Sequence, residues 1–207
     1  MSGTMHDTSM AVAEALLLAP VAELNEQLLR SVRAQARASR ADSPPLVLLL
    51  QAQWSELEDS ALTRLAACPY LLVDAGLARA ERWERPPTLA VSDAARGGCF
   101  VGDGGVALVR QALLFAWHLA RSNRAAAHML VGMSAACASR LASWRLQDLE
   151  SLAELRPNWI APRWQAQPLI WQQLMHAARR NEPMRLRQLQ LRGLQLLAAA
   201  LPGNAGG

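Results

Sequence analysis

Apolar residues recur every three or four positions through most of this 207-residue chain, which is the period of an α-helix with one buried face. Leucine and alanine dominate this apolar content and favour helices, whereas residues that favour strands are scarce. The pattern therefore predicts an all-α fold, a multi-helix orthogonal bundle. The predicted helices cover residues 10–19, 21–40, 56–67, 106–121, 125–130, 135–143, 146–155, 169–180 and 184–201.

Prolines and short polar residues mark the expected helix ends in the first part of the chain. Pro20 separates the first two predicted helices, and the sequence Asp-Ser-Pro-Pro at 42–45 ends the second, because proline inside a helix removes a hydrogen bond. Ser55 and Glu58 have the spacing of a capping box, which would open the helix over residues 56–67.

Two other segments of the first part have less regular patterns. Residues 46–53 form a dense apolar run that fits a buried helix or a short strand, and its periodicity leaves both open. Residues 70–73 are the best strand candidate. A short helical stretch is expected after them, ending at Trp83.

Glycine and proline concentrate in one long segment, which divides the chain into two helical parts. A small hairpin at 99–101 is left open within that segment. The expected organisation is a loose leader at 1–9, an N-terminal helical half at 10–84, a linker at 85–105, a C-terminal helical half at 106–201 and a tail at 202–207.

The two halves share a weak internal repeat. Three residues of the first half recur 87 positions later and two more recur 88 positions later, so a one-residue insertion reconciles the spacings. A duplication would give two similar helical halves related by a pseudo-two-fold axis, and chance matches among abundant leucines and alanines are the open alternative. The matches are Leu62 with Leu149, Leu65 with Leu152, Ala66 with Ala153, Pro69 with Pro157, and Trp83 with Trp171.

Residues 113–134 read LLFAWHLARSNRAAAHMLVGMS and predict a helix, a sharp stop and the start of the next helix. Gly132 is expected to end one helix and Ser134 to cap the next. The apolar side chains of this segment are candidates for the core or for association with other chains. They are Leu113, Leu114, Trp117, Leu130 and Met133.

This segment resembles the signature of FlhD, the flagellar transcriptional regulator, in which a leucine-rich helix leads through an Arg-Ala-Ala-Ala turn to a Gly–hydrophobic–Ser element. The early Leu24-Asn25 pair and the later Leu152-Ala153 pair follow the same family order. The resemblance implies an all-helical, non-enzymatic bacterial regulator that joins a zinc-binding partner like FlhC and binds promoter DNA. Together with a duplication, it implies a covalent version of an FlhD-type dimer.

All 21 basic residues are arginine, and their excess lies towards the C-terminus. Residues 155–207 carry seven arginines against one acid, Glu182, whereas the rest of the chain carries 14 arginines against 16 acids. A localised positive surface suits nucleic acid, an acidic partner or an anionic membrane face.

One group of arginines falls on a single helix face, where it would form a basic stripe for phosphate or an acidic partner. Glu23 and Glu26 lie close by and dilute the charge, so an ordinary solvent-facing surface is the favoured explanation. The arginines of this group are Arg30, Arg33, Arg37 and Arg40.

A second group of arginines flanks the last predicted helix and is the first candidate for DNA contact. A helix C-terminus also favours cations, which explains part of this group without a ligand. Nearby Gln188, Gln190 and Gln195 suit either base edges or solvent. The arginines of the second group are Arg179, Arg180, Arg185, Arg187 and Arg192.

No residue pattern in the chain indicates catalysis, a metal or a cofactor. Cys68, Cys99 and Cys137 are widely spaced, which argues against a zinc site and a disulfide framework and favours a reducing cytoplasm. His118 and His128 lack ligand-spaced partners. We expect no catalytic residue, no bound metal and no membrane insertion.

The tryptophans at 159, 164 and 171 alternate with prolines, which favours a packed turn over a base-stacking platform. The sequence therefore predicts a cytoplasmic, non-enzymatic regulator that acts through protein association, with DNA contact left open. The alternative is a helical adaptor or accessory subunit of a flagellar or type III secretion apparatus that does not bind DNA. Homo-oligomerisation and the partner's identity are also left open.

Overall fold

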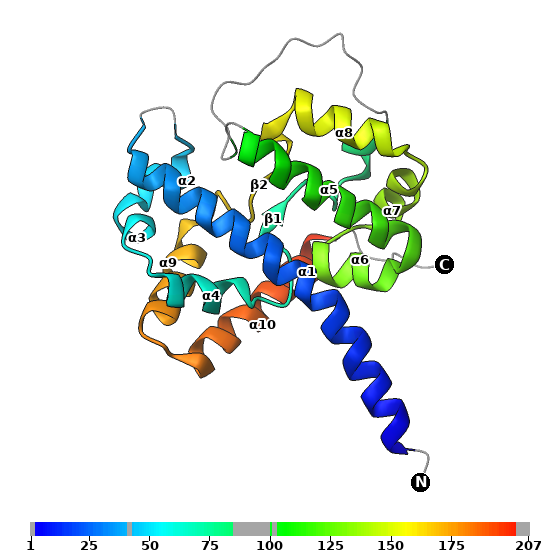
Figure 1. The fold of residues 1–207 in the computed structure, drawn as a ribbon, viewed down its shortest axis with the longest axis horizontal. Coiled ribbons are helices and arrows are strands. Elements are labelled where there is room, and N and C mark those ends of the chain that lie inside the picture. Colours follow the sequence, from blue (N-terminus) through cyan, green and yellow to red (C-terminus); the bar gives the residue numbers. More distant parts are fainter. Residues whose placement is uncertain (1–2, 41–42, 85–99, 101–102, 202–207) are drawn as a thin grey trace.

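The computed structural model describes residues 3–40, 43–84, 100 and 103–201, and ten α-helices make up most of this part of the chain (Figure 1). The predicted helical character is confirmed, with the addition of one small two-stranded sheet. Most of the predicted linker, the hairpin expected at 99–101 and the tail lie outside the described residues. The expected linker is too long at its end, because residues 103–105 already belong to a helix.

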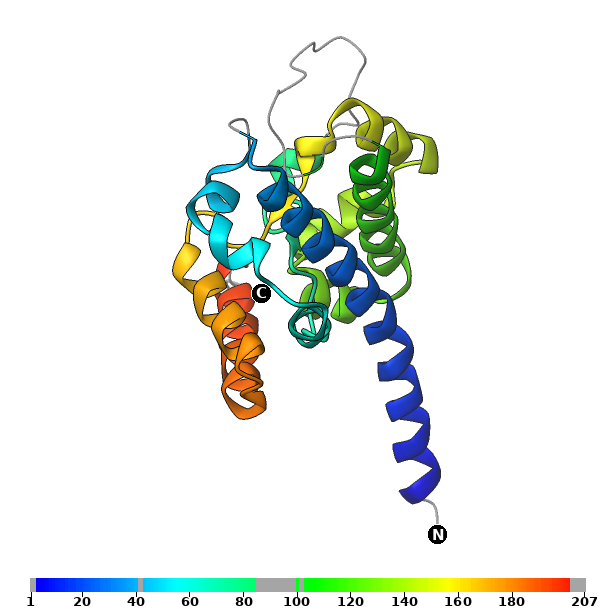
Figure 2. The same ribbon diagram turned by 60° about the vertical axis from the view of Figure 1, so that its left-hand side comes forward.

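Helix α1 spans Gly3–Ala38 and runs through Pro20 without a break. The predicted end at Pro20 and the loose leader from residue 3 onward are therefore wrong. A proline removes one hydrogen bond from a helix interior, but beyond Pro20 the helix buries Val21, Leu24 and Leu28, which offsets that loss. Figures 1 and 2 show the first turns of α1 reaching beyond the other helices.

The dense apolar run forms two short helices, α2 (Pro45–Leu49) and α3 (Gln51–Ser55). Helix α4 (Asp59–Ala66) follows, but the predicted capping box at its start is wrong. The Ser55 hydroxyl donates to the Gln51 carbonyl instead, at 2.8 Å, because Ser55 still belongs to the preceding helix. Glu58 stands at the N-cap of α4 without a side-chain cap bond.

The sheet consists of β1 (Val73–Asp74) and β2 (Ala161–Pro162), paired antiparallel. Of the strand predicted at 70–73, only Val73 belongs to β1. The Leu71 amide donates to the Leu130 carbonyl at 2.7 Å, so residues before Val73 bond to neighbours other than β2. Two short 3-10 helices complete the irregular regions, η1 (Ala80–Trp83) and η2 (Pro157–Trp159).

The helices of the second half agree closely with the sequence pattern. The Asn123 side chain accepts from the Ala126 amide at 2.9 Å, and the Ser134 hydroxyl accepts from the Cys137 amide at 3.2 Å, so side chains cap two helices. Gly132 has φ 65°, a left-handed conformation that glycine adopts without strain. These helices are α5 (Asp103–Ser122), α6 (Arg124–Val131), α7 (Ala135–Ala142), α8 (Leu146–Leu155), α9 (Pro168–Arg179) and α10 (Pro183–Ala200).

One continuous apolar core runs through both halves of the described chain, from Val21 in α1 to Leu197 in α10. Helices α1 and α5 meet within this core, and α4 and α8 pack against them. The α9–α10 pair forms a helical hairpin that packs on α4 and extends along one side of the molecule (Figure 2).

Two buried polar side chains hold the segment between α4 and β1 in the middle of this core. The Asn25 amide group donates to the carbonyls of Tyr70, Ala66 and Cys68 at 2.9, 3.3 and 3.4 Å. Its oxygen accepts from the Leu72 amide at 2.7 Å. One side chain of α1 therefore bonds to four backbone groups, and the three carbonyls among them share the two hydrogens of its amide group.

Arg163 fixes the same segment from the other side. Its guanidinium donates to the carbonyls of Leu71 and Val73, each at 2.8 Å, and of Val131 at 3.1 Å. Burial lowers the pKa of Arg163, and the charge of Asp74 partly opposes this shift. This arginine therefore joins three parts of the chain through backbone acceptors.

Candidate functional site

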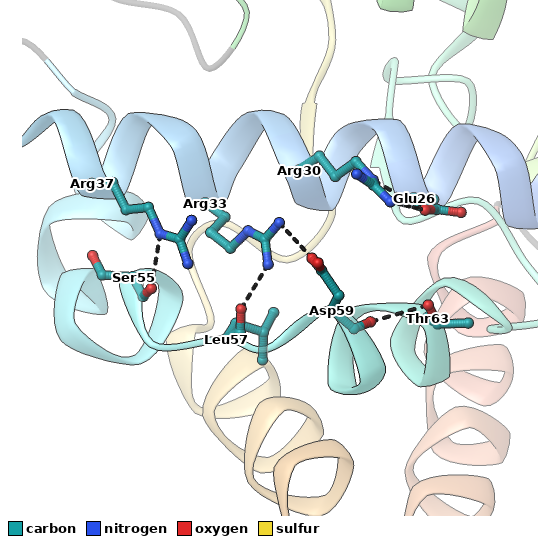
Figure 3. A network of polar contacts seen from close by, with 8 residues as sticks. All are labelled: Glu26, Arg30, Arg33, Arg37, Ser55, Leu57, Asp59 and Thr63. Carbon is teal, nitrogen blue, oxygen red and sulfur yellow. Dashed lines mark hydrogen bonds and ion pairs between the residues drawn. The ribbon is translucent and has the colours of Figure 1, made fainter.

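The arginine face of α1 packs against the α3–α4 turn (Figure 3). One guanidinium nitrogen of Arg33 donates to the Leu57 carbonyl at 2.8 Å, and the other lies 2.7 Å from the Asp59 carboxylate. The Arg33 side chain keeps only 12% of its exposure. Its hydrogen bond and charge lower the pKa of Asp59.

The neighbouring arginines of α1 also have partners within the chain. Arg37 donates through Nε to the Ser55 carbonyl at 3.0 Å, and Arg30 reaches Glu26, one turn away, at 2.6 Å (Figure 3). The hydrogen bond and charge of Glu26 raise the pKa of Arg30. Arg40 is exposed beyond the end of α1. The α1 face thus serves mainly to join α1 to the turn before α4.

Two arginines of the C-terminal group pair with acids near the α9–α10 turn. Arg179 lies 3.1 Å from the Glu56 carboxylate, which links α9 to the turn after α3. Arg180 lies 3.4 Å from Glu182. All four side chains are at least two-fifths exposed, so these pairs contribute little to stability.

The other three arginines of the C-terminal group differ from Arg179 and Arg180 because they have no bonded partner in the described chain. Arg185, Arg187 and Arg192 are exposed on α10, and none makes a hydrogen bond or ion pair with a described residue. The α10 sequence, Pro183–Ala200, contains no acid that could pair with them. The structure therefore brings three uncompensated positive charges together on one helix.

The packing of α10 against the rest of the molecule determines which of its side chains face outward. Leu186, Leu189 and Leu197 are buried on the inner face. A Cβ added to Gly193 would lie 1.8 Å from the Tyr70 hydroxyl and 2.9 Å from the Trp164 ring. Only glycine permits this close approach, which fixes the rotation of α10 about its axis.

Apolar side chains accompany the arginines on the outer face of α10. Met184 is 70% exposed and Leu191 is 55% exposed, and seven positions separate them. Gln188 and Gln195 are also exposed, whereas Gln190 is half-buried. Together, Met184, Arg185, Arg187, Leu191 and Arg192 define what we call the α10 outer surface.

Two hollows border the α9–α10 turn. The larger, of about 740 Å³, has mainly polar walls that include Gln53, Glu58, Gln172, His176 and Arg185. The smaller, of about 360 Å³, lies between the end of α4 and the start of α10. Its walls include Arg64, Ala67, Met184, Leu186, Arg187 and Gln190, so it adjoins the α10 outer surface.

The side chains proposed for the core or for association lie inside or at the edge of the core. Leu113, Leu130 and Met133 are buried, and Leu114 and Trp117 are partly buried. The Trp117 indole donates to the Trp144 carbonyl at 3.0 Å. The structure thus uses this segment for internal packing.

The tryptophan–proline segment is packed, as its pattern predicts. The buried Trp171 indole donates to the Arg163 carbonyl at 2.6 Å. Trp159 meets Trp83 edge-on, with ring centroids 5.6 Å apart, and carries the Arg82 guanidinium 4.2 Å from its ring centre. These contacts leave no open row of rings for stacking bases.

The remaining candidates for chemistry do not form a site in the described residues. Cys68 and Cys137 are buried, and burial raises the pKa of each thiol to about 12, so both stay protonated. No group of three histidine, cysteine or acidic side chains within the described ranges could hold a metal ion. His118 and His128 are exposed.

Among the residues that the structure describes, no helix has the length and apolar character needed to cross a membrane. Comparison of the chain with protein-family models, curated proteins and solved structures found no match. The α10 outer surface is therefore the candidate site, on the evidence of its own geometry and charge.

Proposed function

We propose that this chain is a cytoplasmic, non-enzymatic regulator that works by binding other macromolecules in the control of transcription, as its resemblance to FlhD suggests. The observation that carries the proposal is the set of three exposed arginines on α10 that form no ion pair with a described residue. Unpaired, exposed charges contribute little to folding, and they are available to a ligand.

DNA is the first ligand to test, because arginine binds phosphate through two parallel hydrogen bonds. In a gel-shift assay at two salt concentrations, each lost phosphate contact should reduce the slope of log affinity against log salt by about 0.9. The test variant replaces Arg185, Arg187 and Arg192 by glutamine. It should bind more weakly and depend less on salt.

A matched control removes the same charge from arginines that already have acidic partners, with Arg110, Arg140 and Arg179 replaced by glutamine. It should retain the salt slope of the unmodified protein. Absence of binding at both salt concentrations, or an equal loss in both triple variants, would remove DNA contact from the proposal.

A specific observation also favours a second candidate, an adaptor of a flagellar or type III secretion apparatus that does not bind DNA. Met184 and Leu191 lie exposed among the α10 arginines, and apolar side chains there suit a protein surface better than a phosphate backbone. Co-purification of a secretion component, free of nucleic acid, would support this candidate over the first.

We infer further that the two halves are copies of one helical unit related by a pseudo-two-fold axis. The buried face of α1 supports this, because its positions recur as buried positions of α5, 84 residues later. This spacing requires three more residues between α5 and α8 than between α1 and α4, in addition to the one-residue insertion of the sequence repeat. The matched pairs are Val21 with Gly105, Leu24 with Leu108, Asn25 with Val109, Leu28 with Ala112, Leu29 with Leu113, Val32 with Ala116, and Ala36 with Ala120.

The small sheet supports the same inference. A shift of 88 positions, the spacing of the Trp83 and Trp171 repeat, carries β1 onto β2. Val73 pairs with Pro162, and Asp74 pairs with Ala161. Under this shift, Val73 corresponds to Ala161 and Asp74 corresponds to Pro162. Each residue of β1 therefore pairs with the β2 residue that corresponds to its neighbour, as antiparallel pairing across a two-fold axis requires.

Two tryptophan pairs between the halves become equivalent under the duplication when Trp54 is matched with Trp144, 90 positions later. The rings of Trp54 and Trp171 have centroids 5.2 Å apart and planes inclined by 55°. The rings of Trp83 and Trp144 have centroids 5.3 Å apart and planes inclined by 52°. If Trp54 corresponds to Trp144, these two pairs are the same contact formed twice, in opposite directions.

Double-mutant cycles with leucine, which removes the aromatic ring, test the duplication through these pairs. Each pair should show a coupling free energy of about 0.5–1.5 kcal/mol, and the two values should agree. Unfolding in urea measures both cycles. The pair of Trp54 with Trp117, two tryptophans with no ring contact between them, is a control that should show no coupling. Coupling in only one of the two contacts would contradict equivalent halves.

A further inference from the structure

The α10 outer surface combines apolar and basic side chains at helical spacing. Met184 and Leu191 are seven positions apart, so they lie above one another on the same side of the helix. Both are more than half exposed, whereas the inner face of α10 is already buried against the molecule. An exposed apolar row with a seven-residue spacing is the pattern by which one helix recognises another.

Arginines flank this apolar row. Arg187 lies three positions after Met184 and four before Leu191, so it shares their side of the helix. Arg185 and Arg192 lie on an adjacent side. Since α10 contains no acid and these arginines have no partner among the described residues, the complementary surface must supply negative charge.

The smaller hollow gives this surface a place for an inserted side chain. Ala67, Met184 and Leu186 line it with apolar atoms, and Arg64 and Arg187 contribute positive charge to its walls. Glu182 also lines it, and this acid is paired with Arg180 at 3.4 Å. Its volume of about 360 Å³ leaves room for an apolar anchor residue. A buried apolar anchor surrounded by charged contacts is the arrangement in which a few residues dominate binding energy.

We propose that the α10 outer surface binds an amphipathic acidic helix of a partner protein, with an apolar residue in the hollow beside Met184 and carboxylates on Arg187 and Arg192. This inference rests on the proposed role in association and names its partner chemistry. A second copy of this chain does not fit, because a two-fold contact here would bring like charges together. DNA leaves Met184 and Leu191 without apolar partners.

The test uses the full chain and a fluorescein-labelled designed helical peptide with a leucine stripe and glutamates on both sides. Fluorescence anisotropy should show saturable binding that weakens as salt is added. Two control peptides accompany it: one has lysine in place of glutamate, and one has the same composition with the leucine stripe scrambled. Both should bind at least about tenfold more weakly.

Two double variants locate the binding on α10. Met184→Ser with Leu191→Ser, and Arg187→Glu with Arg192→Glu, should each weaken peptide binding by about tenfold or more. Circular dichroism and the urea midpoint should stay unchanged, because all four side chains are exposed.

Matched controls change the same residue types elsewhere. Leu48→Ser with Leu49→Ser alters two exposed leucines of α2, and Arg79→Glu with Arg124→Glu alters two exposed arginines outside α10. Neither control should weaken binding by more than about twofold.

Three results would overturn the inference: no saturable binding of the acidic peptide, equal binding of the lysine peptide, or equal effects of the test and control variants. A labelled DNA duplex is assayed in parallel. Binding of DNA that needs Arg187 and Arg192 but tolerates serine at Met184 and Leu191 would assign this surface to phosphate. That result would overturn the protein inference and leave DNA contact in place.

Discussion

Both α1 and α10 carry several arginines, yet the molecule uses the two groups differently. Arg33 and Arg37 donate to backbone carbonyls of the α3–α4 turn. Arg187 and Arg192 extend from α10 without a partner in the described chain. The difference lies in what is packed opposite each helix, and not in the arginines themselves.

This contrast shows how to separate structural from available arginines. A turn packed beside α1 presents carbonyl groups that need donors, and arginine supplies several donors at the end of a long side chain. The outer face of α10 meets no such segment among the described residues. Whether its arginines already bond to other residues of the chain, more than how many arginines it carries, decides which basic face can bind a ligand.

The largest effect on stability is expected for Arg163, an arginine that is buried inside the molecule. Replacing Arg163 by methionine keeps an unbranched chain but leaves the carbonyls of Leu71, Val73 and Val131 without their donors. The free energy of unfolding, measured in urea, should fall by about 3 kcal/mol or more. Arg163→Lys keeps the charge with fewer donors, so its free energy of unfolding should lie between those of the unmodified protein and Arg163→Met. An unchanged urea midpoint for Arg163→Met would contradict this role.

A smaller loss is expected on the α1 face. Arg33→Gln removes the donor to the buried Leu57 carbonyl and the contact with Asp59. Unfolding in urea should show a loss of about 1–2 kcal/mol. The same change at Arg30, whose pair with Glu26 is exposed, serves as the control and should lower the urea midpoint much less than Arg33→Gln does.

The α1 face should also give the protein a small dependence of stability on pH. Contact with Arg33 lowers the pKa of Asp59 in the folded chain. Its stabilising contribution is therefore complete above the ordinary aspartate pKa of about 4 and is lost as pH falls through the lowered folded value. Urea midpoints of the unmodified protein and Asp59→Asn should converge as pH is lowered across this window. A constant difference between them would contradict the contact.

The smallest effect is expected on α10. Arg187→Gln should change the free energy of unfolding by less than about 0.5 kcal/mol, because its guanidinium contacts no described partner. Urea unfolding alongside Arg33→Gln makes the comparison direct. Equal losses at the two positions would mean that Arg187 has a structural role and would weaken its assignment to a ligand.

Several features could be read from the sequence because they depend on neighbours within a few positions. Helix α8 begins and ends at the predicted residues. Gly132 and Ser134 end one helix and cap the next, since a left-handed glycine and a serine hydroxyl act on the adjacent turn. The exposed arginines of α10 were also among the candidates, because charge can be counted directly.

Other features involve contacts between distant parts of the chain, which local patterns do not specify. Asn25 bonds to backbone groups more than forty positions away, and Arg163 bonds to carbonyls about ninety positions away. The signals for them were weak: an amide on an otherwise apolar helix face, and a single arginine among tryptophans and prolines. Their importance depends on the backbone that folding brings to them.

The sequence by itself determined that the chain is mainly helical, where most of its helices lie, and that its positive charge gathers near the C-terminus, since periodicity, caps and charge are local properties. Only the tertiary structure decided that α1 continues through Pro20 and that one arginine face is occupied while the other is open. Those outcomes depend on which surfaces meet, because burial and hydrogen bonding with remote segments outweigh local preference.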